Sequence, residues 1–244
     1  MKLLRLPLTV LACAIALTGC SKADEAFDAK VHAYLMAHPE VIREAIEKLQ
    51  QKEEAQALAE NNLAIAQARV LIPKNRQAIE SDPRDFVANP KGAITLTEFY
   101  DYRCPHCVNV APAVLSLIQS NPDVRVVFKE FPIFGAVSER AAAGAIAVKK
   151  AGGDYLGVYH DFMAARPLDA AAIDRILQAH GLAPARLDQS EFKAAAARQL
   201  GDTRKLTETL HIQGTPAFIV GDTLVPGEDL DAVRAAIEKA RGKG

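Results

Sequence analysis

The chain has 244 residues, of which 50% are apolar and 24% are charged, which is enough for one substantial folded domain and an accessory segment. Its formal net charge of −1 gives no electrostatic reason to expect a nucleic-acid partner, and none is predicted. Length, composition and net charge therefore do not distinguish between functions, and local motifs have to be considered.

Residues 1–23 have the pattern of a secretory signal peptide. Lys2 and Arg5 precede the apolar run LTVLACAIAL, which is shorter than the ~20 residues of an ordinary membrane span. The run ends in LTGC, which resembles the bacterial lipobox, so Cys20 is a predicted lipidation site. The alternative is ordinary cleavage after Ser-Lys-Ala at 21–23. We therefore expect a periplasmic protein. By analogy, the serine after Cys20 suggests a lipid anchor in the outer membrane.

Export leaves one pair of thiols. Cys13 is removed with the signal peptide, and Cys20 is either lipidated or lost, so only Cys104 and Cys107 remain. A secreted chain with a single close pair is not a disulfide-stapled scaffold. The loop that the pair closes is too short to contribute much loop-closure entropy. A structural role is therefore the poorer explanation.

Residues 24–82 are predicted to be a helical extension with an apolar stripe on one side. The stripe consists of Ile42, Ile46 and Leu49, at helical spacing. Such a stripe has to be buried, either on the main domain or on another copy of the chain, so the extension is a probable oligomerisation segment on physical grounds. Residues 81–92 are rich in Pro, Asp and Asn and are expected to form a linker or turn.

Strands and helices follow one another in residues 83–244. Runs of β-branched and aromatic residues predict strands at 93–100, 124–131, 216–220 and 223–227. Ala-rich periodicity predicts helices after the first strand, throughout about 131–213, and at 229–241. A single sheet flanked by helices would bury these strands, so the fold class is α/β with an inserted helical subdomain.

The motif CPHC at 104–107 joins the first predicted strand to a helix. Cys104 is therefore expected at the N-cap, and Pro105 at the first helical position, where its missing N–H costs nothing. Free N–H groups of the first turn, and His106 if it is protonated, favour a thiolate at Cys104. Cys107 lies one turn further on the same side. We predict that Cys104 attacks a disulfide and that Cys107 resolves the mixed disulfide.

Metal binding is the competing hypothesis for this pair. A zinc site usually needs four ligands, and none of the other five histidines is paired at ligand spacing. Two soft thiolates could hold Cu(I) between subunits, so a copper-handling thiolate protein remains an alternative. We assign no metal site and no cofactor.

Three segments resemble the DsbA-like branch of the thioredoxin superfamily. They are EFYDYRCPHC at 98–107, FKEFPIFG at 128–135 and GTPAFIV at 214–220. The resemblance covers about residues 86–242 and implies a thioredoxin fold interrupted by the helical block. It also implies a cis peptide bond between Thr215 and Pro216 that exposes backbone groups to a substrate chain.

The same resemblance implies a role for Glu98. The family places a buried acid at the position of Glu98, where it moves protons to and from Cys107. Alternation along the strand does not show which face Glu98 occupies. Lys129 could balance its charge, although an exposed lysine is the expected state. Residues 34–50 resemble the extension of the suppressor-of-copper-sensitivity protein C group, in which it drives self-association.

The function that the resemblance implies is that of a thiol:disulfide oxidoreductase acting on cysteine-containing envelope proteins, with a membrane redox partner. Pro105 and His106 resemble the strongly oxidising members of the family. Thr215 before the cis-proline goes instead with isomerases, and an oligomer suits the shuffling of disulfides in one client. Isomerase or general interchange activity is the prediction, and a dedicated oxidase is the alternative.

Overall fold

The computed structural model describes the backbone of residues 20–242 and the side chains of residues 26–242. The predicted signal peptide lies outside the described residues, apart from the start of α1 (Cys20–Ala37). The chain divides into two compact units, residues 1–58 and 59–244, and each is described by itself. Within residues 20–242, no helix combines the length and the apolar character needed to cross a membrane.

The described part of the first unit consists of α1 and the first part of α2 (Glu40–Glu80). The predicted helical character of the extension is therefore confirmed. The apolar stripe remains open to solvent, since the three side chains are 47–54% exposed: Ile42, Ile46 and Leu49. Within the described part of the first unit, this apolar helix face is thus exposed.

The second unit is built on one five-stranded sheet with the order β1-β3-β2-β4-β5. The strands are β1 (Phe86–Ala88), β2 (Ile94–Tyr100), β3 (Val124–Glu130), β4 (Ala217–Val220) and β5 (Thr223–Pro226). β2 and β3 are parallel, and the other neighbours are antiparallel. The four strands predicted from the sequence are confirmed. β1 corrects the prediction that 81–92 is only a linker, because three of these residues pair along the edge of β3.

Helices cover both faces of this sheet, so burial does not alternate along β2. One face packs against α3 (Pro105–Ser120) and α8 (Leu230–Arg241), and its core includes Leu96, Tyr100 and Phe128. The other face packs against the second part of α2 and the end of α7 (Ser190–Thr209). Successive residues of a strand point to opposite faces. Glu98, between Leu96 and Tyr100, therefore points to the α3 face.

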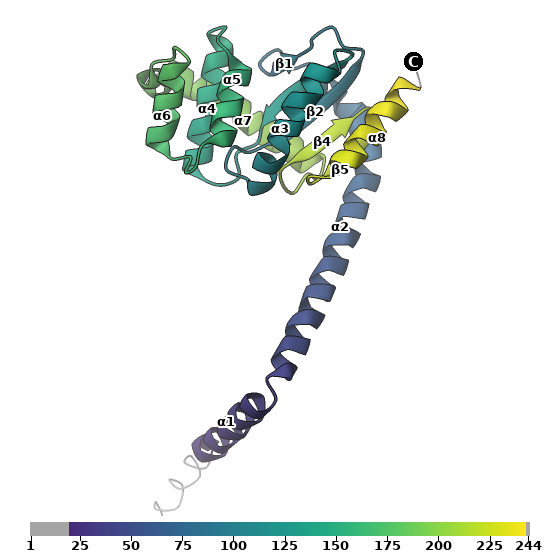
Figure 1. The fold of residues 1–244 in the computed structure, drawn as a ribbon, viewed down its shortest axis with the longest axis vertical. Coiled ribbons are helices and arrows are strands. Elements are labelled where there is room, and N and C mark those ends of the chain that lie inside the picture. Colours follow the sequence, from purple (N-terminus) through teal and green to yellow (C-terminus); the bar gives the residue numbers. More distant parts are fainter. Residues whose placement is uncertain (1–19, 243–244) are drawn as a thin grey trace, which may run out of the picture. The chain divides into compact units, whose positions relative to one another are not determined.

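The predicted helical insertion lies between β3 and β4. It contains α4 (Ala136–Lys150), α5 (Tyr155–Ala164), α6 (Ala170–Ala179), the short 3₁₀ helix η1 (Pro184–Asp188) and α7. Figure 1 shows α4, α5 and α6 grouped in one block, apart from α8. Asp154 and Asp169 begin α5 and α6 by accepting hydrogen bonds from backbone N–H groups of the first turn. The fold class predicted from the sequence is confirmed.

The second part of α2 is anchored on the sheet through its last carbonyl groups. Lys129 Nζ donates to Ala78 O at 2.6 Å, and Arg125 donates to Glu80 O at 2.7 Å. Cations at a helix C-terminus also interact favourably with the helix dipole. Ile72 and Ile79 are fully buried. The compact unit accordingly begins at Ala59 and not at residue 83, because helical periodicity alone does not show where packing begins.

Candidate redox site

The turn between β2 and the CPHC motif is held by one buried carboxylate. Asp101 Oδ1 accepts from Arg103 N at 2.8 Å, and Asp101 Oδ2 accepts from Ile133 N at 2.7 Å and Phe134 N at 3.0 Å. The Asp101 carbonyl also accepts from Cys104 N at 3.1 Å. These bonds tie the start of the motif to the loop after β3. The position of Cys104 is thus fixed by both central strands.

Cys104 lies at the N-cap of α3, with Pro105 at the first helical position, as the sequence predicts. Both cysteines are free thiols and both are buried, at 2% exposure for Cys104 and 0% for Cys107. Cys104 Sγ lies 3.1 Å from the carbonyl oxygen of Thr215, to which the protonated thiol can donate. This contact joins the reactive helix end to the loop that precedes β4.

The two thiols have opposite ionisation properties. The hydrogen bond from the Cys107 thiol makes the largest contribution to lowering the pKa of Cys104 to about 5, against the effect of burial, and Thr215 and the first N–H groups of α3 add to it. Burial, followed by the hydrogen bond to Cys104, raises the pKa of Cys107 far above its ordinary value. At neutral pH the pair therefore consists of a thiolate at 104 and a thiol at 107.

His106 contributes to the site through its backbone. The N–H group of His106 is among the groups that lower the pKa of Cys104. The ring is exposed, and its Nδ1 lies 3.3 Å from a carboxylate oxygen of Glu228. The effect of a protonated imidazole on the sulfur stays a prediction.

Glu98 is fully buried on the α3 face, where an acid that exchanges protons with Cys107 would have to be. Its partner is the hydroxyl group of Tyr159, which donates to the two carboxylate oxygens at 3.3 and 3.4 Å. Burial raises the pKa of Glu98 to about 8. A carboxyl group with such a pKa can both take up and release a proton near neutral pH.

Four buried tyrosines around Glu98 were not predicted from the sequence. Tyr100 Oη lies 2.9 Å from Tyr102 Oη and 2.6 Å from Tyr155 Oη. Tyr155 Oη donates to Glu130 at 2.5 Å, and burial raises the pKa of Glu130 to about 7. Tyr155 and Tyr159 come from α5, inside the insertion. α5 is far from the CPHC motif in the chain. The only signal in the sequence for its place near Glu98 is therefore its high content of aromatic residues.

Lys129 corrects the expectation of an exposed lysine. Its side chain is 3% exposed and forms an ion pair with Asp85, besides its bond to Ala78 O. Lys129 lies on the α2 face of β3, whereas Glu98 lies on the α3 face of β2. The alternative that Lys129 balances the charge of Glu98 is therefore wrong as well.

The predicted cis peptide bond between Thr215 and Pro216 is present. Gly227 N donates to Pro216 O at 2.8 Å and holds the loop against the end of β5. The Thr215 hydroxyl is buried, and within the part of the chain that the structure describes it has no hydrogen-bond partner. Thr215 thus presents a buried hydroxyl group that helps to lower the pKa of Cys104 but forms no hydrogen bond of ordinary geometry among the described residues.

Two further points concern the alternative of metal binding and the predicted lipidation. Among the described residues, no group of three or more His, Cys, Asp or Glu side chains is arranged to hold a metal ion. The predicted lipidation at Cys20 concerns a side chain outside the described set, which begins at residue 26.

A thiolate and a thiol of such different acidity, on a sheet of this topology, define a thioredoxin-fold protein of thiol–disulfide exchange. Residues 95–238, more than half of the chain, match the family of the DSBA-like thioredoxin domain, and the chain belongs to this family of thiol–disulfide oxidoreductases. Residues 25–56 match the N-terminal domain of the copper resistance protein ScsC.

Solved structures extend this likeness over most of the chain. A thioredoxin-like oxidoreductase from Silicibacter pomeroyi is 32% identical, covers 69% of this chain and 98% of its own, and has a TM-score of 0.63. ScsC from Proteus mirabilis, in a transitional conformation, is 26% identical, covers 92% of this chain and 99% of its own, and has a TM-score of 0.64.

The curated relatives include longer proteins. The Na⁺/H⁺ antiporter NhaA 3 from Salinispora tropica is 28% identical over 169 residues, which is 65% of this chain and 25% of the antiporter. The chain thus spans about a quarter of the length of that relative.

Proposed function

We propose that this protein is an exported thiol:disulfide interchange enzyme that rearranges disulfides in envelope proteins. The observation that carries the proposal is the asymmetry of the pair, with the pKa of Cys104 at about 5 and that of Cys107 raised. A thiolate is the attacking species in disulfide exchange, and a protonated second thiol does not compete for the substrate.

The proposed reaction begins when the Cys104 thiolate attacks one sulfur of a substrate disulfide. A mixed disulfide forms, and the other substrate sulfur leaves as a thiolate. In isomerisation this substrate thiolate attacks a different substrate disulfide, forms a new disulfide and releases another substrate thiolate. That thiolate then attacks the substrate sulfur of the mixed disulfide, and Cys104 leaves as a thiolate. The enzyme thus returns to its reduced form, and no net oxidation occurs. If the substrate stalls, Glu98 takes the proton of Cys107, and Cys107 then displaces the substrate.

Thr215 supports interchange over dedicated oxidation. Its buried hydroxyl group lacks a partner among the described residues, and its carbonyl oxygen contacts Cys104 Sγ. A buried hydroxyl gains free energy when it finds a hydrogen-bond partner. In a mixed disulfide, this hydroxyl is placed to bond near the sulfurs and to alter the release of the substrate.

Self-association belongs to the same proposal. The exposed stripe at Ile42, Ile46 and Leu49 lies within residues 25–56, which match the N-terminal domain of ScsC. We expect the stripes of two or three copies to bury one another. Light scattering should give a dimer or trimer for the mature chain and a monomer for a chain that begins at Ala59. Two monomers would show that assembly does not depend on this stripe.

The truncation at Ala59 leaves the folded unit intact. The residues of α2 that pack on the sheet, including Ala68, Ile72 and Ile79, all remain in the shortened chain. A chain that begins at residue 83 would lose them and would confuse loss of assembly with loss of stability.

Export and anchoring rest on the signal sequence. We propose a periplasmic enzyme that is lipidated at Cys20, with the outer membrane as the expected site of the anchor. An isomerase has to be kept reduced, so we also propose a membrane redox partner that returns the 104–107 pair to the dithiol form.

Two ribonuclease assays test the direction of exchange. Reduced protein should restore activity to scrambled ribonuclease, and deletion of residues 24–58 should weaken this activity because it removes the assembly of several sites. A Cys104→Ser variant is the control for uncatalysed reshuffling. Activity found only with oxidised protein and reduced ribonuclease would refute the isomerase proposal and would indicate a dedicated oxidase.

A further inference from the structure

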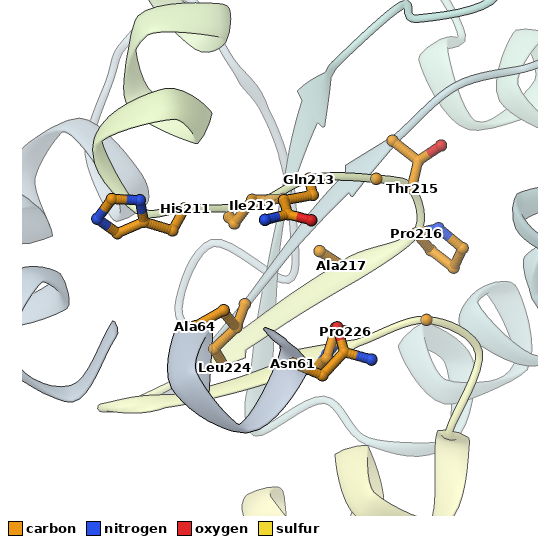
Figure 2. Close-up of a pocket in the computed structure, with 12 residues that line it drawn as sticks. Asn61, Ala64, His211, Ile212, Gln213, Thr215, Pro216, Ala217, Leu224 and Pro226 are labelled. Carbon is orange, nitrogen blue, oxygen red and sulfur yellow. The ribbon is translucent and has the colours of Figure 1, made fainter. Parts of the chain in front are cut away.

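A pocket of about 200 Å³ lies beside the cis-proline loop, on the part of the second unit that α2 covers. One wall is the segment from the end of α7 to β4, which includes Gln213 and Thr215. The opposite wall is α2, from which Asn61 and Ala64 project toward that segment (Figure 2). Leu224 of β5 also lines it.

The pocket adjoins the reactive sulfur through a shared residue. Thr215 lines the pocket, and the carbonyl oxygen of the same residue lies 3.1 Å from Cys104 Sγ. A substrate polypeptide that is bound to Cys104 by a mixed disulfide and extends toward the pocket has to pass Thr215. The pocket therefore adjoins the redox site at Thr215.

The wall beside Thr215 offers unpaired backbone groups. On either side of it, Ile212 N donates to Thr207 O, and Gly227 N donates to Pro216 O. Between these points, no backbone hydrogen bond within residues 20–242 uses the N–H groups of Gln213, Gly214 or Thr215. A free backbone N–H group at the surface of a pocket can donate to a carbonyl oxygen of a bound polypeptide chain.

Size and charge restrict the occupant further. No Lys, Arg, Asp or Glu side chain lines the pocket, and His211 is the only lining residue that can carry a charge, so the lining is mainly uncharged. A cavity of roughly 150 Å³ in another protein holds a benzene molecule, whereas drug-sized ligands need about 300 Å³ or more. A pocket of about 200 Å³ thus suits one large apolar side chain.

We propose that this pocket is a subsite for an extended polypeptide substrate, in which one apolar side chain near the substrate cysteine lies against Ala64 and Leu224. The inference rests on the proposed function, since the substrate is held at Cys104. It makes α2 a wall of the substrate site, in addition to its part in the extension.

Peptide binding by the full mature chain in its reduced form tests the proposal. The probes are four fluorescent peptides with a central Ser in place of cysteine and a single Leu at position −3, −2, +2 or +3, compared with an all-Gly/Ser peptide by anisotropy. At one position, Leu should tighten binding about tenfold, as expected for partial burial of one apolar side chain. Asn61→Trp should fill the pocket and abolish this gain.

Asn62→Trp is the matched control, because Asn62 is also exposed on α2 but does not line the pocket. It should keep the gain from Leu. Gln213→Trp blocks the pocket from the opposite wall and should act like Asn61→Trp, so the test survives if one variant folds poorly.

Three outcomes would overturn the proposal. The first is that Leu gives no gain in binding to the wild type at any position. The second is that the gain persists in both Asn61→Trp and Gln213→Trp. The third is that these variants change the assembly mass without changing peptide binding, which would assign the pocket to another copy of the chain. The Ser peptides cannot exchange disulfides. Loss of interchange with binding intact therefore refutes the proposed function and not the subsite.

Discussion

Removal of the Cys107 thiol should raise the pKa of Cys104. The hydrogen bond from Cys107 is the largest of the contributions that bring this pKa to about 5. Cys107→Ser keeps an O–H donor at this place, and Cys107→Ala removes it. We expect the pKa of Cys104 to be higher in the Ala variant than in the Ser variant. Both values should remain below the ~8.5 of a free thiol, because the N–H groups at the start of α3 are unchanged.

The size of the effect decides which quantity to measure. At pH 7 a thiol with a pKa of about 5 is roughly 99% ionised, and a free thiol with a pKa of ~8.5 is roughly 3% ionised, a ratio of about 30. A less basic thiolate is also a weaker nucleophile, with a Brønsted coefficient of roughly 0.4–0.5, which costs about 25- to 60-fold over this pKa difference. The two factors nearly cancel. The rate at pH 7 is therefore uninformative, and the midpoint of the pH profile is the useful observable.

The assay is the rate of alkylation by iodoacetamide between about pH 3 and pH 10 for both variants. The profiles should rise through midpoints in the acid range for Cys107→Ser and at higher pH for Cys107→Ala. The ultraviolet absorbance of the thiolate gives an independent midpoint. A midpoint near 8 or above in Cys107→Ser, or identical midpoints in the two variants, would contradict the assigned role of the Cys107 hydrogen bond.

Three further predictions follow from the structure. Glu98→Gln should slow resolution by Cys107 about hundredfold in stopped-flow experiments, and should remove the rate increase that the wild type shows as the pH rises through about 8. A wild-type rate in this variant would exclude Glu98 as the proton acceptor. Lys129→Met should cost up to about 3–5 kcal/mol of unfolding free energy at pH 7, because it removes the cation that pairs with the buried Asp85 carboxylate. Burial raises the pKa of Asp85 to about 6 even though Lys129 lowers it, so this loss should shrink as the pH falls toward 6, where Asp85 becomes protonated in the wild type too; a loss independent of pH would refute the argument. Cys20→Ala should move the protein from the membrane fraction to the soluble periplasm, and a soluble wild type that begins at Asp24 would show that the LTGC prediction is wrong.

The sequence was sufficient for the central strands, the helix that carries CPHC and the helical insertion, because each has a strong local signal. It was insufficient where the two faces of a strand had to be distinguished. β2 and β3 are buried on both faces, so neither Glu98 nor Lys129 could be placed by alternation. β1 was missed because three residues within a Pro- and Asp-rich stretch carry too little pattern.

Tertiary partners were the second kind of information that the sequence lacked. The carboxylate beside Lys129 belongs to Asp85 in the segment predicted as a linker, and the hydroxyl group on Glu98 belongs to Tyr159 in the insertion. Both contacts join segments that are distant in the chain. Periodicity also showed that α2 has an apolar side, but not that its second part packs on the sheet while the stripe of its first part stays exposed.

The equilibrium between the 104–107 pair and glutathione tests the central claim most directly. A Cys104 thiolate with a pKa of about 5 stabilises the reduced form of the pair. The pair should therefore be oxidised reversibly, with a reduction potential above that of thioredoxin, which is roughly −270 mV. A pair at or below this potential, or one that does not equilibrate with glutathione, would contradict the account.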